Sequence, residues 1–238
     1  MSDPLRWADT DRETLRAELP EALVLLPVGA TEQHGPHLAT GTDALLAHTV
    51  TERAAALADA PRRLILAPPL PFGSSDHHLP FGGTLSLTPE TFLAVLLDLA
   101  RSIAAQGGRR LVVVNGHGGN TGICQAFAQA AAVRHDLSVG YFDYWRFAEA
   151  AAPGHAGEFE TALVLAVRPE LVRKPKSRPD PPPLPAVDRV DLQATSVWRS
   201  IDGYTDHPAR ATEENGRRWL DGIVDAAAAA FVELARTL

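Results

Sequence analysis

Four side chains able to bind a divalent metal ion fall close together near the N-terminus: Glu32, His34, His37 and Asp43. Carboxylate oxygen is a hard ligand and imidazole nitrogen a borderline one, so the combination suits a divalent transition metal. Glu32 and His34 are two residues apart, and an extended backbone directs both side chains to the same side. Taken alone, the stretch also fits a polar surface loop in which Thr42 or Asp43 caps the following helix.

The position of this polar run along the chain favours a functional role. It follows residues 22–28, an apolar segment with the pattern of a buried strand. Two further apolar segments, 64–67 and 111–114, are followed in the same way by the polar or glycine-rich runs 68–84 and 115–120. Because the carboxyl ends of parallel strands meet at one edge of a sheet, we expect the three runs to form a single site.

The third run places His117 between glycines, which lets the backbone approach a ligand closely. The backbone N–H groups of Gly118 and Gly119, near the start of the next helix, are suited to binding an anion or a developing oxyanion. A phosphate-binding loop is the alternative, but the run has neither the Walker lysine nor the G-x-G-x-x-G spacing.

A further candidate pair, His155 and Glu160, opens a later helix that starts from the same edge. His155 is placed to carry a proton. The alternatives are that His155 is an ordinary surface histidine, and that Glu158 and Glu160 merely favour the positive start of the helix. We expect His37 to be a hydrogen-bonding group of the loop, and only one of the adjacent His77 and His78 to face the site.

Strands that alternate with helical segments predict an α/β protein with a parallel sheet and right-handed crossovers. We expect strands over 22–28, 64–67, 111–114 and 138–142, and helices over 9–19, 43–59, 88–106, 121–135, 155–167 and about 212–237. The first helix is expected to be capped by Asp9 or Thr10. Residues 173–187 are rich in proline and predict an extended, mobile connector. Residues 188–211 show no regular pattern.

Composition limits the class of protein. A chain of 238 residues with 45% hydrophobic composition suits one domain, residues 1–238, with a full core. The net charge is −7 and no lysine or arginine block is present, which argues against a nucleic-acid partner. The single cysteine, Cys124, excludes an internal disulfide and a cysteine-rich zinc site. With no signal peptide and no membrane-spanning stretch in the pattern, we expect a cytoplasmic protein without a membrane partner.

Four motifs in order resemble the creatininase (creatinine amidohydrolase) family. They are Thr-Glu-Gln-His-Gly-Pro-His-Leu with Thr-Asp, His-x-x-Phe-x-Gly-Thr, Asn-Gly-His-Gly-Gly-Asn and His-Ala-Gly-x-x-Glu-Thr. The resemblance spans residues 22–168 and extends weakly to 211–216. It implies a three-layer α/β/α fold with a mostly parallel sheet, two divalent metal ions and a homo-oligomer, a hexamer in the family. Zinc is the metal we expect first, with manganese and iron also fitting.

The resemblance also implies roles for particular residues. Glu32, Asp43 and His117 match the ligands of one metal, and His34 with the shared Asp43 matches the other. Creatininase completes the second site with a glutamate that corresponds to Gly119 here. The expected substitute is Glu160, with Glu158 as the open alternative. His155 matches the histidine thought to assist proton transfer.

A second departure lies in the second motif, where the family has Glu-His and this chain has His77-His78. We expect His78, Gly118 and Gly119 to contact substrate. The implied activity is cleavage of a C–N bond in a small cyclic amide, a formamide or a related amide by a metal-bridging hydroxide. The alternatives are a peptidase that acts on a modified peptide, as in mycofactocin maturation, and a non-catalytic metal-binding scaffold with the same fold.

Overall fold

The computed structural model describes residues 3–149, 154–183, 185, 187–190, 192 and 194–238. Within them, five strands form one parallel sheet in the order β1-β3-β2-β4-β5. The strands are β1 (Leu5–Arg6), β2 (Leu23–Val28), β3 (Leu64–Leu66), β4 (Arg110–Asn115) and β5 (Ser138–Asp143). The four expected strands are confirmed, and the two-residue edge strand β1 was too short to show a pattern.

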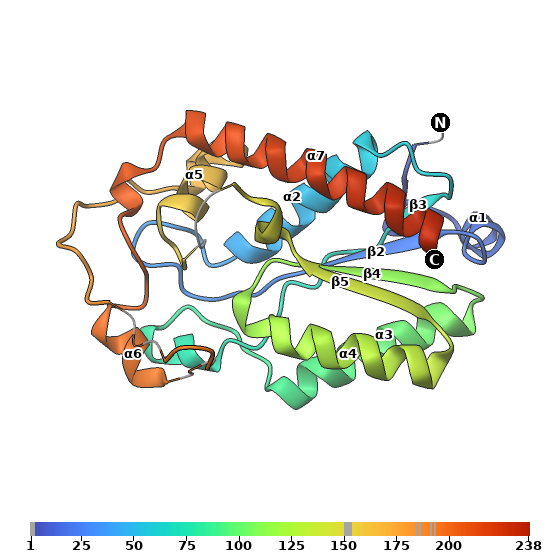
Figure 1. Cartoon of the computed structure of the whole chain (residues 1–238), viewed down its shortest axis with the longest axis horizontal. Coiled ribbons are helices and arrows are strands. Elements are labelled where there is room, and N and C mark those ends of the chain that lie inside the picture. The colour runs from blue at the N-terminus through green and yellow to red at the C-terminus, as the bar shows by residue number, and fades with distance from the viewer. Residues whose placement is uncertain (1–2, 150–153, 184, 186, 191, 193) are drawn as a thin grey trace.

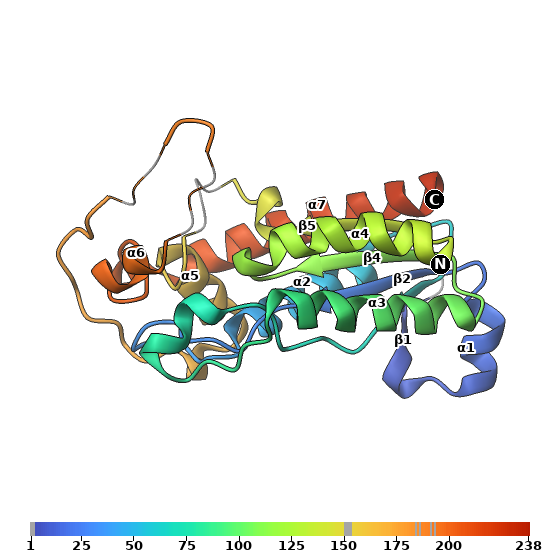
Figure 2. The same ribbon diagram turned by 90° about the horizontal axis from the view of Figure 1, so that it is seen from below.

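Helices cover both faces of this sheet and make three layers (Figures 1 and 2). One layer contains α2 (Thr42–Leu57), α5 (Glu158–Val167) and α7 (Glu213–Thr237). The other contains α1 (Arg12–Glu18), α3 (Pro89–Ala105) and α4 (Thr121–His135). The predicted three-layer α/β/α fold is therefore confirmed.

The central strands β2 and β4 are apolar on both faces because each face packs against one helical layer. Leu25 and Val112 join the core beneath α2, α5 and α7, whereas Val24 and Leu111 join the core beneath α1, α3 and α4. The register pairs Val24 with Leu111 and ends with Val28 opposite Asn115. This alignment brings the loops that follow the two strands to the same edge.

Helix starts agree with the sequence at one of three positions. Thr88 caps α3 and its side chain accepts from the backbone N–H of Thr91, as the pattern predicts. The cap of α1 is Asp11, not Asp9 or Thr10, because its carboxylate accepts from the first-turn N–H groups. Helix α2 is preceded by Gly41 with no side-chain cap, so Asp43 lies inside the first turn and its carboxylate is free to face the site.

The long last helix is also confirmed. Its buried stripe includes Ile223, Ala227 and Phe231, with Trp219 and Leu234 partly buried against the same core. No helix of the described residues is long and apolar enough to cross a membrane.

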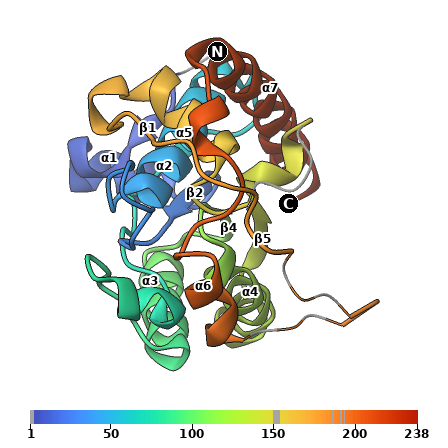
Figure 3. The same cartoon turned by 90° about the vertical axis from the view of Figure 1, so that its left-hand side faces the viewer.

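The stretch expected to be irregular, 188–211, contains the short helix α6 (Thr195–Ser200), which was not predicted. The preceding proline-rich segment is extended over its described residues. Hydrogen bonds to backbone carbonyls of other segments hold it in place. Arg173 donates its N–H to the carbonyl of His37 at 2.7 Å. Arg178 donates to the carbonyls of Ile201 and Tyr204 at 3.1 Å each. These contacts place α6 at the same end of the molecule as the start of α5 (Figure 3).

Candidate active site

The three polar runs that follow β2, β3 and β4 come together, as the sequence predicts. Asn120, at the start of α4, joins them: its Nδ2 donates to the carbonyl of Gly29 and its Oδ1 accepts from the N–H of Ser74, both at 3.0 Å. Asn115, the last residue of β4, holds the loop that carries His117. Its Oδ1 accepts from the N–H of His117 at 3.1 Å and its Nδ2 donates to the His117 carbonyl at 2.7 Å.

The first group of candidate metal ligands lies around His117. Its Nδ1 is 3.2 Å from Oε1 of Glu32 and 3.2 Å from Oδ2 of Asp43. On the other side of the ring, Nε2 lies 3.0 Å from the carbonyl of Ser74, and this hydrogen bond fixes the orientation of the ring. The side chains of all three candidate ligands are buried.

The second group shares the carboxylate of Asp43. Nε2 of His34 lies 2.9 Å from Oδ1 of Asp43 and 3.9 Å from Oε2 of Glu160. Nδ1 of His34 lies 3.0 Å from the carbonyl of Glu32. Since a carbonyl only accepts, Nδ1 carries a proton, and Nε2 is the ring nitrogen that faces the two acids. Asp43 therefore directs one oxygen to each group.

These residues fit a metal centre by a test independent of the resemblance. Both carboxylate oxygens of Glu32 and Oδ2 of Asp43 are buried without a hydrogen-bond partner among the described residues. Buried carboxylate oxygens without donors are costly, and bound cations would satisfy them. In three groups the ligand atoms lie within 4.8 Å of one another: Glu32, His34 and His155; Glu32, His77 and His117; His34, Asp43 and Glu160.

Protonation of the unliganded site reflects this crowding of acids and imidazoles. Burial opposes charging of His34, but Asp43, Glu160 and Glu32 outweigh it and raise its pKa to about 10. The pKa of His117 is raised for the same kind of reason, chiefly by Glu32 and Asp43 against burial. The pKa of Asp43 is lowered, because His34 and His117 outweigh its burial. Burial raises the pKa of Glu160 to about 7.

Glu160 lies in the cluster, whereas a side chain at Gly119 could not be accommodated there. A Cβ at Gly119 would lie 2.4 Å from Nε2 of His117 and 2.4 Å from the carbonyl oxygen of Ser74, so the backbone leaves no room for a side chain there. Glu160 reaches the cluster instead, from the first turn of α5, with its Oε2 accepting from the N–H of Ala156 at 2.5 Å. Glu158 belongs to none of the clusters in the described residues.

His155 and His78 stand beside the clusters with their rings stacked at 4.2 Å. Nδ1 of His155 lies 3.4 Å from Oε1 of Glu32, and Nε2 of His78 lies 3.7 Å from the same oxygen. Burial and neighbouring imidazoles lower the pKa of His78 to about 2 and hold that of His155 well below its ordinary value. The backbone of His155 is also held in place, because its N–H donates a hydrogen bond to Oγ1 of Thr205 at 2.8 Å.

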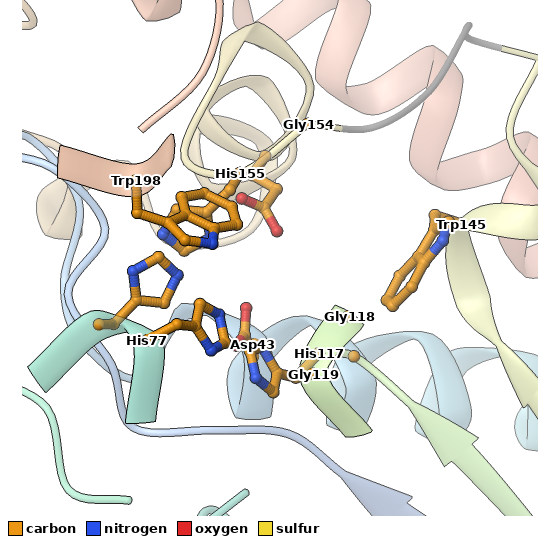
Figure 4. Close-up of a pocket in the computed structure, with 12 residues that line it drawn as sticks. Asp43, His77, His117, Gly118, Gly119, Trp145, Gly154, His155 and Trp198 are labelled. Atoms are coloured by element: carbon orange, nitrogen blue, oxygen red, sulfur yellow. Dashed lines mark ion pairs between the residues drawn. The ribbon is translucent and has the colours of Figure 1, made fainter. Parts of the chain in front are cut away.

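A pocket of about 320 Å³ opens onto these groups (Figure 4). Its lining residues are Asp43, His77, His78, Gly116, His117, Gly118, Gly119, Trp145, Gly154, His155, Glu160 and Trp198. The expectation that only one of His77 and His78 would face the site is wrong, because both line the pocket. The 3-10 turn that carries them, Asp76–Phe81, presents neighbouring side chains to the same cavity.

Two tryptophans of the pocket were missed by sequence reasoning. Figure 4 shows Trp145 and Trp198 on opposite sides of the pocket, with Asp43 and His117 between them. Trp198 comes from α6, and its ring lies 4.7 Å from that of His78 and 5.5 Å from that of His155. Nothing local in the sequence marks it, since only the folding back of the chain after the proline-rich segment brings it here.

His37 holds the loops together from outside the metal clusters. Its Nε2 lies 3.0 Å from the carbonyl of Ala156 and 3.2 Å from Oγ1 of Thr161. The hydrogen-bonding role expected for His37 is therefore confirmed, and it links the loop after β2 to the segment that carries His155 and Glu160.

The family model described as creatinine amidohydrolase matches residues 7–231. The chain belongs to the creatininase family. It is 36% identical over 217 residues to a mycofactocin precursor peptide peptidase of Mycobacterium tuberculosis, covering 85% of this chain and 81% of that protein. It is 32% identical over 195 residues to a creatinine amidohydrolase of Pseudomonas putida, covering 71% of this chain and 72% of that protein.

Solved structures of creatininase share the fold. A manganese form superposes with a TM-score of 0.82 at 28% identity, covering 97% of this chain and 98% of that one. A zinc–zinc form of a variant gives a TM-score of 0.80 at 26% identity, with 98% of both chains covered. Creatininase-family proteins are hydrolases of carbon–nitrogen bonds, and this chain is therefore an enzyme of that class.

Proposed function

We propose that this chain holds two divalent metal ions and uses them to hydrolyse an amide C–N bond. The observation that carries the proposal is the placement of Asp43, whose two carboxylate oxygens face His34 and His117 separately. Glu32 and Glu160 add a further carboxylate to each side. A single shared carboxylate between two such groups is suited to a pair of neighbouring cations.

Each ion would have its own ligand set. Glu32, Asp43 and His117 would hold one ion, and His34, Asp43 and Glu160 the other. Imidazole and carboxylate donors suit zinc, and manganese and iron also fit such a set. When bound, the ions polarise the amide carbonyl and lower the pKa of water.

The protein itself supplies the path of the proton. Hydrolysis adds water across the C–N bond: the water oxygen bonds to the carbonyl carbon, and one proton must reach the departing nitrogen. Nδ1 of His155 faces the cluster and is placed to accept that proton and to pass it on as the C–N bond breaks. His78, Gly118 and Gly119 line the pocket beside this path and would contact the substrate.

Two substrate classes follow from different observations. A peptide amide is favoured by the peptidase relatives, which match more of this chain at higher identity than the creatinine amidohydrolase does. The lack of room for a side chain at Gly119 points the same way, because the resemblance to creatininase would put a glutamate there. A small cyclic amide is the second candidate, favoured by the close similarity to solved creatininase structures.

The pocket indicates what the rest of the substrate carries. Among the described residues that line it, none is a lysine or an arginine, and two are tryptophans. A free carboxylate would find no lysine or arginine among these lining residues, so we propose that the scissile amide is flanked by neutral groups. We also propose that the protein assembles as a homo-oligomer, which light scattering on the purified chain would test.

The function is tested by hydrolysis assays on metal-loaded protein with creatinine, a formamide and end-blocked peptides. We expect one class to be hydrolysed, and Asp43→Asn to lose at least about 100-fold in rate together with bound metal. Asp98→Asn, on the exposed face of α3, is the matched control and should retain both. Retention of metal and activity by Asp43→Asn would refute the proposal. Metal binding without hydrolysis of any substrate would favour a non-catalytic scaffold.

A further inference from the structure

The side-chain amide of Gln33 is buried beside the metal-binding residues, and its orientation is fixed by the backbone. Oε1 accepts from the N–H of Gly35 at 2.9 Å, and Nε2 donates to the carbonyl of Gly203 at 2.5 Å. A backbone N–H only donates and a carbonyl only accepts, so the two ends of the amide cannot be exchanged. The second hydrogen of Nε2 is left for a neighbouring histidine.

The backbone carbonyl of Gln33 determines which ring nitrogen of His155 carries the proton. Nε2 of His155 lies 3.0 Å from the main-chain carbonyl of Gln33, which can only accept. Nε2 therefore carries the proton of the neutral ring. Nδ1, which faces Oε1 of Glu32 at 3.4 Å, presents a lone pair to the site.

His78 receives the remaining hydrogen of the Gln33 amide. Nδ1 of His78 lies 2.8 Å from Nε2 of Gln33, closer than Nε2 of His155 at 3.2 Å, which already carries a proton. Nδ1 of His78 thus accepts, and Nε2 carries the proton. That Nε2 is buried without a hydrogen-bond partner among the described residues.

The two rings are therefore the same tautomer turned in opposite directions. We propose that Gln33 is a positioning residue that makes His78 present an N–H, and His155 a lone pair, to the same bound amide. This role rests on the proposed amide hydrolysis, which needs both: a donor to the carbonyl oxygen as negative charge develops there, and an acceptor for the proton of water. The unpartnered N–H of His78 finds its acceptor in the substrate carbonyl.

Gln33 also connects this chemistry to the tryptophan of α6. Its amide holds the carbonyl of Gly203, which follows α6 in the chain, while Trp198 of α6 packs on the rings of His78 and His155. A Cβ at Gly203 would lie 3.0 Å from Nε2 of Gln33, so the close approach favours glycine, as does its φ of +75°. The amide thus fixes ring direction and ring packing together.

The variant Gln33→Glu tests this role, because it replaces the amide N–H that donates to His78 by a carboxylate oxygen that accepts. The tautomer of each histidine is read from its ¹⁵N shifts by NMR on the full chain, as purified and after zinc addition. In the wild type we expect both His78 and His155 as Nε2–H tautomers. In Gln33→Glu we expect His78 alone to become Nδ1–H, because the carbonyl that binds His155 is unchanged. We expect kcat to fall about 100-fold, as for loss of one oxyanion donor.

Controls separate positioning from general damage. Gln106→Glu adds the same charge at an exposed position and should change neither tautomer nor kcat. Gln33→Met removes the donor without a charge, should leave His78 as a mixture of tautomers, and covers the case in which the glutamate variant does not fold. A wild-type His78 with its proton on Nδ1, or a His78 tautomer unaffected by both variants, would overturn the proposal. The expected tautomer change in a protein that hydrolyses no substrate would support the positioning role and count against the proposed function.

Discussion

Nε2 of His34 lies 2.9 Å from Oδ1 of Asp43, and both side chains are buried. In the metal-free chain this contact is a charged hydrogen bond, because the pKa of His34 is raised to about 10 while that of Asp43 is lowered. The raised pKa of His34 stabilises the fold fully below its ordinary value of 6.5, and that contribution is lost as pH rises through about 10. The lowered pKa of Asp43 acts in the opposite direction: its contribution is present above 3.8 and is lost as pH falls.

A metal ion at this site must therefore displace protons. His34, with a pKa of about 10, is protonated at pH 7 to 8 in the metal-free protein, and the pKa of His117 is also raised, so zinc binding should release at least one proton. Calorimetric titrations in buffers of different ionisation enthalpy measure that number. We expect zinc affinity to rise with pH toward about 10, where His34 loses its proton unaided. An observed binding heat independent of the buffer would contradict this assignment.

Glu160→Gln tests which glutamate completes the second group. The change removes one charged ligand beside His34, so we expect about one of two metal equivalents to be lost in metal analysis after dialysis. Glu158→Gln, two residues earlier on α5, is the matched control and should keep the full metal content. The reverse result would assign the ligand to Glu158.

Gly119→Ala tests whether the close contacts around Gly119 exclude a side chain at this position. Its new Cβ would lie 2.4 Å from both Nε2 of His117 and the Ser74 carbonyl, so we expect a loss of about 1–3 kcal/mol in unfolding free energy. In thermal melts of a protein of this size that corresponds to a fall of roughly 2–12 °C in Tm. Gly118→Ala is the control, since no described atom lies within 4 Å of its Cβ position. Equal melting temperatures for the two variants would show that the loop relaxes freely.

Trp198→Ala tests the wall of the pocket formed by α6. The ring packs on His77, His78 and His155, and aromatic pairs contribute about 0.5–1.5 kcal/mol each. We expect KM to rise about 3- to 10-fold, and Trp198→Phe to restore most of the loss. Steady-state kinetics on the substrate found in the panel measures this. An unchanged KM in the alanine variant would show that substrate does not reach Trp198.

The sequence determined the sheet and the chemical identity of the site. Strand β2 is apolar throughout and β4 is apolar over residues 111–114, and such runs are visible without a structure. The rule that parallel strands end at one edge was enough to predict that the loops carrying Asp43 and His117 would meet. The order of four motifs indicated the family. These features depend on the order of apolar and polar residues over short stretches, which can be read from the sequence alone.

Tertiary structure alone decided the rest. Trp198 reaches the pocket because Arg178 and Gln33 hold the chain after the proline-rich segment, and these contacts join residues far apart in the sequence. Glu160 rather than Glu158 faces His34 because α5 begins at Glu158 and its first turn sets the direction of each side chain. The direction of the His78 and His155 rings likewise depends on carbonyls from distant loops. Ring orientation and proton position follow from packing between segments, and no periodicity along the chain encodes them.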